Sequence, residues 1–181
     1  MYIVIGIVAL VLLVIIIKAL IGGKTYHTVR LKPGNGLVYS DNDLEIEFFK
    51  GQAENSRIDF YSNRGINIKL RNKTNTSISI KWDSCLFIYP DGKSVELVAA
   101  KTPIGATRKI SSDPMPVAAN SYVEAFACPK DKFVADVGRL HEPIFLGGEP
   151  ETKAEFRCVL PIKLANEVKP YEFCFIVEKQ V

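Results

Sequence analysis

Alternating hydrophobic and polar residues mark a run of predicted β-strands in the middle of the chain. In residues 66–71, isoleucine and leucine alternate with asparagine, lysine and arginine, and a second alternation ends on Trp82. Because successive side chains of a strand point to opposite faces, each segment has one apolar and one polar face. Turn-forming residues occur at 72–76 and, as Pro-Asp-Gly-Lys, at 90–93. Residues 65–99 are therefore predicted to be a β-meander of three successive strands with one buried face.

The same alternation predicts a hairpin at the end of the chain. Residues 156–164 and 171–177 each carry their large apolar side chains on one face, and residues 165–170 form the predicted loop. Pairing Leu164 with Tyr171 brings all these apolar side chains to the same side of the hairpin. A buried face of this kind is what sets a strand register.

Shorter patterns predict the remaining elements. Further strands are predicted at residues 44–48, 57–62, 85–89, 94–99 and 121–128, with a short edge strand near residues 108–110. Asp131, as a cap before an apolar side, predicts a short helix over residues 131–140. Proline and glycine make residues 101–120 and 141–152 long connections. About eight or nine strands with few helices predict an all-β, antiparallel, immunoglobulin-like β-sandwich.

An apolar run without a polar face occupies the N-terminus. Residues 2–17 are uninterrupted, and after Lys18 the run continues to Gly23. As a helix, residues 2–23 would rise about 33 Å, enough for a hydrocarbon core of about 30 Å. A cleaved signal peptide would have a charged first region and a small-residue cleavage site, and this run has neither. The sequence therefore predicts an uncleaved single-pass transmembrane helix over residues 1–23.

The charge of the chain is uneven and supports this division. Of 23 basic and 20 acidic residues, four basic and no acidic ones lie in the first 32 positions, namely Lys18, Lys24, Arg30 and Lys32. We expect these four to flank the membrane, with residues 24–43 as a basic juxtamembrane connector and residues 44–181 as the β-sandwich domain. The domain is close to neutral, which argues against a nucleic-acid partner because such binders carry a basic patch.

The sequence is compatible with two orientations of the predicted anchor. The basic residues after the apolar run place that flank in the cytoplasm by the positive-inside rule. An all-β domain held by an anchor is equally natural on the outer side. In both cases the predicted location is the cytoplasmic membrane, with the lipid bilayer as one partner.

Residues 68–100 combine an asparagine-rich turn, the alternation Ile-x-Ile-x-Trp-Asp and a hydrophobic strand that closes on Pro-Asp-Gly-Lys. This stretch resembles the immunoglobulin-like β-sandwich domains of uncharacterised bacterial membrane-anchored or lipoprotein-type envelope proteins. The resemblance covers under a fifth of the chain and implies a β-sandwich at the cell envelope, with no catalytic residues. The chain departs from the lipoprotein type because no cysteine lies near the apolar run.

Four cysteines, Cys85, Cys128, Cys158 and Cys174, allow three disulfide pairings. The predicted register places Cys158 and Cys174 on opposite faces of the hairpin, which argues against that pair. No Cys-x-x-Cys spacing is present, so a zinc knuckle or a thioredoxin-like site is disfavoured. Small buried hydrophobic residues, disulfides of an oxidising compartment and reactive thiols are the three readings.

Other candidate residues give weak signals. His27 and His141 lie far apart in the sequence and make no metal site by their spacing, so no metal or cofactor is expected. Trp82 continues the apolar face of its strand and is predicted to be a core residue. Asn72 and Asn75 begin glycosylation sequons, which matter only in a eukaryotic secretory setting.

These features predict a single-pass, membrane-anchored, non-catalytic β-sandwich that binds or scaffolds a protein partner at the membrane. The predicted contact surfaces are the long segments 101–120 and 131–152, because loops on a rigid scaffold commonly carry binding sites. The alternative is an envelope enzyme or enzyme accessory with a loop site around His141. A third hypothesis is a redox-responsive membrane protein that uses its cysteines.

Overall fold

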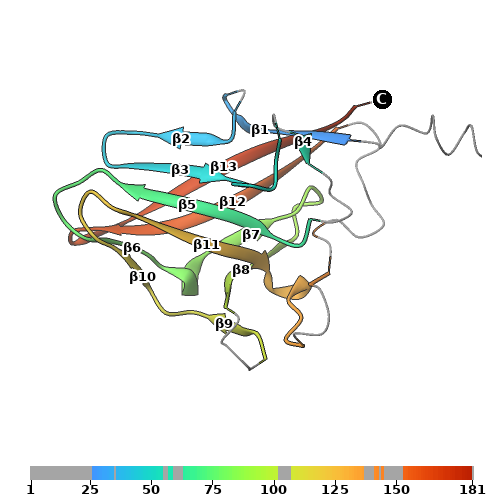
Figure 1. Ribbon diagram of the computed structural model, residues 1–181. Helices are drawn as coiled ribbons and strands as arrows, with labels where there is room; N and C mark the ends of the chain where they lie inside the picture. The colour runs from blue at the N-terminus through green and yellow to red at the C-terminus, as the bar shows by residue number, and fades with distance from the viewer. Residues whose placement is uncertain are drawn as a thin grey trace, which may run out of the picture.

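The computed structural model describes residues 26–34, 36–54, 57–58, 63–101, 107–136, 141–142, 144 and 153–180. These residues form thirteen strands in one antiparallel, curled sheet and two short 3₁₀ helices (Figure 1). The prediction of an all-β antiparallel fold is confirmed. No helix in this part of the chain is long and apolar enough to cross a membrane, and the predicted anchor at residues 1–23 lies outside the described residues.

The strands and 3₁₀ helices follow one another as β1 Tyr26–Lys32, β2 Val38–Ser40, β3 Leu44–Phe48, β4 Arg57–Ile58, β5 Ile66–Asn72, β6 Ile78–Ile80, η1 Trp82–Ser84, β7 Leu86–Ile88, β8 Ser94–Lys101, β9 Lys109–Ser111, β10 Met115–Val117, β11 Tyr122–Pro129, η2 Lys130–Lys132, β12 Lys153–Leu164 and β13 Glu167–Gln180. Their order across the sheet is β2-β3-β5-β11-β8-β7-β12-β13-β1-β4. In addition, β9 pairs with β8, and β6 pairs with both β10 and β12.

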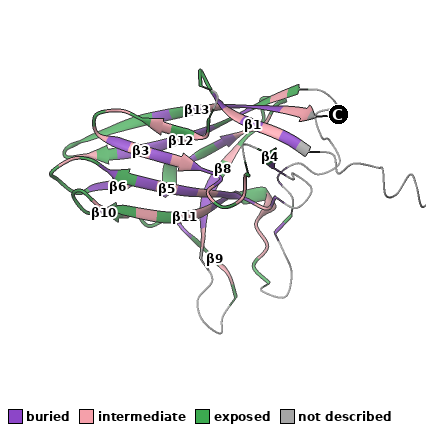
Figure 2. Ribbon diagram, turned by 45° about the horizontal axis from the view of Figure 1, so that its top comes forward, coloured by how far each residue is buried: buried purple, intermediate pink, exposed green. Residues whose placement is uncertain are grey.

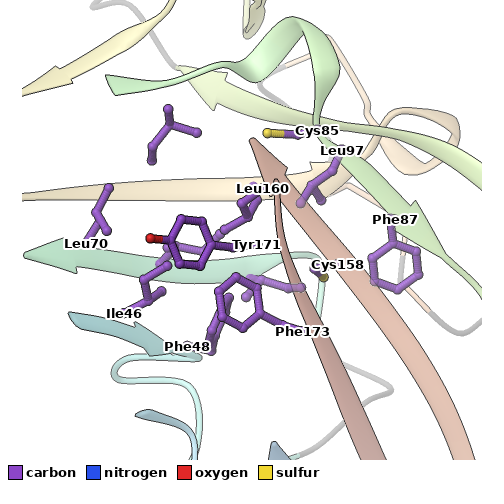
Figure 3. Close-up of a cluster of buried hydrophobic side chains, with 14 of the residues drawn as sticks. Ile46, Phe48, Leu70, Cys85, Phe87, Leu97, Cys158, Leu160, Tyr171 and Phe173 are labelled. Atoms are coloured by element: carbon purple, nitrogen blue, oxygen red, sulfur yellow. The ribbon is translucent and has the colours of Figure 1, made fainter. Parts of the chain in front are cut away.

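The sheet curls at β8, which changes partners along its length. Residues 94–96 pair with β7, whereas residues 97–99 pair with β11. The strands β2, β3, β5 and β11 therefore lie across from β12, β13 and β1 (Figure 1). Aromatic side chains fill the space between them: the Phe48 ring lies 4.8 Å from the Phe173 ring, centroid to centroid (Figure 3).

Period-two alternation decides which side of each strand faces this core. In β3 and β5 every second residue is buried, and the polar residues between them are half-buried or exposed (Figure 2). The outcome agrees with the faces that the sequence predicts for these two strands. Trp82 is 2 % exposed, as predicted for a core residue.

The predicted β-meander over residues 65–99 is wrong in its pairing. β5 pairs with β3 and β11, whereas β6 pairs with β10 and β12. Within this stretch only β7 and β8 form a hairpin of consecutive strands. Trp82 lies in η1 rather than in a strand, and this single turn shifts the alternation so that Phe87 is buried and Leu86 is 37 % exposed.

The C-terminal hairpin is present, but its predicted register is wrong. Leu164 pairs with Glu167 across a turn of two residues, Ala165 and Asn166, and Tyr171 pairs with Leu160 instead of Leu164. The register is therefore displaced by four residues. Because four is an even number, every side chain keeps the face that the alternation predicts.

Two other predictions need correction. The expected connector at residues 24–43 contains β1 and β2, and β1 pairs with β13 over its whole length. The expected helix at residues 131–140 is a 3₁₀ turn at Lys130–Lys132, and the described residues that follow are not helical. The predicted edge strand near residues 108–110 is confirmed as β9, which pairs with β8.

Candidate functional site

The curled sheet has two outer faces. We call the outer face of β12, β13 and β1 the paired-charge face. Four ion pairs between described residues cross it: Arg30–Glu178 at 3.5 Å, Lys32–Glu155 at 3.5 Å, Lys153–Glu178 at 3.6 Å and Arg157–Glu172 at 2.7 Å. Arg30 and Lys32, which were predicted to flank the membrane, thus lie on β1 beside carboxylates of the sheet. Lys18 and Lys24 lie outside the described residues.

The second outer face belongs to β2, β3, β5 and β11, and we call it the Tyr122 face. The strand register arranges its side chains in two rows, Val38–Glu47–Lys69–Glu124 and Ser40–Glu45–Arg71–Tyr122. In each row an acidic residue of β3 lies beside a basic residue of β5. Side chains directly opposite each other on neighbouring strands are close enough to interact, so the face carries ordered stripes of alternating charge.

Tyr122 is the most exposed large hydrophobic side chain among the described residues. Its exposed fraction is 58 %, and Val38 on the same face is 55 % exposed. The ammonium nitrogen of Lys69 lies 4.7 Å from the centroid of the Tyr122 ring, a cation–π contact. Arg71 is the cross-strand partner of Tyr122. The face therefore presents to the solvent an aromatic ring beside two basic residues of β5.

A cleft of about 210 Å³ lies beside these rows, lined by Lys50, Asn67, Ile68, Glu124, Ala125 and Phe126. Lys50 and Glu124 form an ion pair across it. The hydrogen bond from Lys50 lowers the pKa of Glu124, so the carboxylate remains charged at neutral pH. The cleft thus combines a charged rim with an aromatic wall.

The side chain of Gln52 holds the turn after β3 against the start of β5. Its Nε2 donates to the Asn63 side chain at 3.0 Å and to the Gly65 carbonyl at 2.9 Å. Its Oε1 accepts a hydrogen bond of 2.7 Å from the backbone N–H of Asn67. These bonds use both ends of the amide and position Lys50, two residues earlier, at the rim of the cleft.

Gly65 allows β5 and β11 to approach closely behind the cleft. A Cβ atom at this position would meet the ring of Phe126 and would lie 2.5 Å from the Ala127 carbonyl oxygen. No side chain fits at such separations, so the glycine is required by space and not by backbone angle. The position of the Phe126 ring at the cleft depends on this contact.

His141 has the contacts of a structural residue. Its ring stacks on Phe126, with centroids 5.7 Å apart, and also contacts Phe133 at 5.1 Å. Its Nδ1 accepts a hydrogen bond of 2.9 Å from the Val134 N–H. Burial, and to a lesser extent the charge of Arg108, lowers the pKa of His141. Within the described part of the chain no carboxylate hydrogen-bonds to the ring, so the geometry does not favour a base at this position.

All four cysteines are free thiols. Cys85, Cys128 and Cys158 are buried, and Cys174 is half-buried. Burial raises the pKa of Cys85 and of Cys128 to about 12. Cys158 pairs with Phe173, which is the residue before Cys174. Cys158 and Cys174 therefore lie on opposite faces of the hairpin, as predicted. A thiol with a high pKa is a poor nucleophile at neutral pH because little thiolate is present. The three buried cysteines therefore act as small apolar residues.

The structure describes only part of the other predicted sites. Among the described residues, no group of three or more histidine, cysteine, aspartate or glutamate side chains could hold a metal ion. The predicted contact segment at residues 101–120 forms β9 and β10. The second, at residues 131–152, lies mostly outside the part of the chain that the structure describes.

Sequence reasoning missed the Tyr122 face, although a signal was present. In the segment that begins at Tyr122, the residues that face the core are Val123, Ala125 and Ala127, whereas Tyr122 shares a side with Glu124. An aromatic residue on the polar side of an alternating strand indicates an exposed ring. The neighbours from β2, β3 and β5 are not visible in that local pattern.

No protein-family model, no curated protein and no solved structure matches this chain. Its function is therefore inferred from its own residues.

Proposed function

We propose that the protein is a single-pass, membrane-anchored, non-catalytic binding module that recruits a protein partner through the Tyr122 face. The single observation that carries this proposal is the exposed Tyr122 ring beside Lys69 and Arg71. Tyrosine and arginine are enriched among the residues that dominate the energy of protein interfaces. An exposed ring gains free energy when a partner removes its apolar surface from water.

The comparison of the two outer faces supports the choice of surface. On both outer faces charged side chains lie beside opposite charges of neighbouring strands, but among the described residues only the Tyr122 face adds an exposed aromatic ring. The Tyr122 face combines charge rows with two exposed apolar side chains, Val38 and Tyr122. Charge rows select and orient a partner, and the aromatic anchor supplies affinity.

The proposed architecture is an immunoglobulin-like β-sandwich after a transmembrane helix at residues 1–23. Two observations support the sandwich: β8 divides its pairing between β7 and β11, and Phe48 of β3 contacts Phe173 and Phe175 of β13. The apolar run of the sequence supports the helix. An anchor raises the local concentration of the module at the membrane, so a weak contact suffices for recruitment.

Site-specific photocrosslinking in the full chain tests the binding face. A photoreactive residue in place of Tyr122 should capture a protein partner in the native membrane, and Arg71→Glu should abolish the capture by reversing a neighbouring charge. The matched control places the photoreactive residue at Arg157, on the paired-charge face. Equal capture of the same partner from position 157, or capture from position 122 that survives Arg71→Glu, would contradict the proposal.

A further inference from the structure

β1 begins almost immediately after the apolar run. The run ends at Gly23, and the first residue of β1 is Tyr26. Three Cα–Cα steps of 3.8 Å span at most about 11 Å. The headgroup layer on one side of a bilayer is about 5–8 Å thick. A strand that begins within this reach of the hydrocarbon core has no stalk that could hold it away from the membrane.

We propose that the β-domain rests directly on the bilayer through the end of the sheet at which β1 begins, and that basic side chains at this end contact anionic lipid headgroups. This inference rests on the proposed transmembrane anchor. The strand register shows which residues share this end, because Tyr26 pairs with Gln180, His27 with Ile58 and Lys153 with Glu178. The start of β1, β4 and the C-terminal end of β13 lie together in Figure 1.

The charges at this end suit an anionic surface. Among the described residues the basic side chains here are Arg30, Arg57, Lys153 and Lys179, and the acidic ones are Glu54, Glu155 and Glu178, with Arg30 and Glu155 both opposite Ile176. Glu178 is shared by two cations, at 3.5 Å from Arg30 and 3.6 Å from Lys153. One carboxylate cannot neutralise both, so positive charge remains. Basic residues next to a bilayer are attracted to anionic headgroups.

The same geometry places the opposite end of the domain far from the membrane. β12 has 12 residues and ends at the turn of Ala165 and Asn166, so that turn lies about 36–40 Å along the sheet from Lys153. Tyr122 begins β11 next to the end of β5, where the Asn72 N–H donates to the Ser121 carbonyl. Figure 1 shows these turns at the end opposite the start of β1. A partner that reaches the outer part of the Tyr122 face therefore approaches from the side away from the bilayer.

A fluorescent probe on each end of one hairpin tests the orientation. The full chain is incorporated into nanodiscs that contain anionic lipid and a quencher on the headgroups. Lys153→Cys and Asn166→Cys are labelled separately in a Cys174→Ser background, because Cys174 is half-buried and the other three cysteines are buried. We expect the probe at position 153 to lose most of its emission and the probe at position 166 to keep most of its emission.

The outcomes separate the two proposals. A chain that does not enter nanodiscs would contradict the anchor and therefore the proposed function. A chain that enters nanodiscs but leaves both probes equally bright, or quenches position 166 more than position 153, would overturn the inference while the anchor stands. With zwitterionic lipid in place of anionic lipid, quenching at position 153 should decrease. Unchanged quenching would contradict the role of anionic headgroups.

Discussion

The side-chain amide of Asn72 donates a hydrogen bond of 3.1 Å to the carbonyl oxygen of Val117, 45 positions away in the sequence. The same nitrogen also donates to Thr76 at 2.7 Å and to Ala118 at 3.0 Å. The side-chain oxygen accepts from the N–H and the hydroxyl of Thr74 at 2.9 and 2.8 Å. Asn72 is fully buried, so it joins the turn after β5 to the segment between β10 and β11.

We expect Asn72→Ala to destabilise the fold by about 2–4 kcal/mol, because several buried backbone groups lose their partner. Asn75→Ala is the matched control, since Asn75 is exposed in the same turn and should change stability by less than about 0.5 kcal/mol. Fluorescence of Trp82, the one tryptophan of the chain, reports urea unfolding of the full-length protein. Equal midpoints for the two variants would show that the network is dispensable. The burial also excludes glycosylation of Asn72 in the folded protein.

Gly65→Ala should destabilise the domain by about 1–3 kcal/mol, because a methyl group must displace the Phe126 ring and the β11 backbone. Gly36→Ala is the control, since the nearest atom to a Cβ there is 4.0 Å away. The same urea titration measures both. A Gly65→Ala variant as stable as the Gly36→Ala variant would mean that β11 moves to accommodate the methyl group with no loss of stability.

The fold should lose stability on mild acidification through His141. Burial lowers the folded-state pKa of His141 below the unfolded value of about 6.5, so protons bind the unfolded chain preferentially. The stability that neutral His141 contributes is fully present above the unfolded pKa of about 6.5. As the pH falls below that pKa, the free energy of unfolding decreases by less than about 1.4 kcal/mol per pH unit. His141→Gln keeps an acceptor for the Val134 N–H. Between pH 7.5 and 5.5 the urea midpoint of this variant should fall less than that of the unsubstituted protein. An identical decrease in both proteins would exclude His141 as the cause.

Cys174 should be the first thiol to react with a maleimide, because the other three cysteines are buried. Burial, and then the carboxylate of Glu155 at 3.7 Å from the sulfur, raises the pKa of Cys174. Glu155→Gln should therefore increase its reaction rate several-fold at neutral pH, because more thiolate is present. Glu167→Gln, at the far end of the same hairpin, is the control and should leave the rate unchanged. Mass spectrometry of the labelled, folded protein identifies the site, and prior labelling of Cys85, Cys128 or Cys158 would contradict the burial.

The sequence by itself determined which side of β3, β5, β12 and β13 faces the core. Alternation is a local property with a period of two residues, so Ile66, Ile68 and Leu70 point inward whatever strand lies beside them. The C-terminal hairpin illustrates the limit of this information. A displacement of four residues leaves every face unchanged, and the closing turn at Ala165 and Asn166 has no glycine to indicate it.

Only the tertiary structure decided which strands are neighbours. β1 reads as a connector because it is a single strand between the apolar run and a Pro-Gly turn, and its stability comes from pairing with β13 at the other end of the chain. The Tyr122 face likewise joins residues 38 to 124 of the sequence. Pairing energy depends on partners that are distant in the chain, so no local pattern specifies it. That is why the sequence predicts the buried core of this protein, whereas its candidate binding face appears only after the strands are assembled.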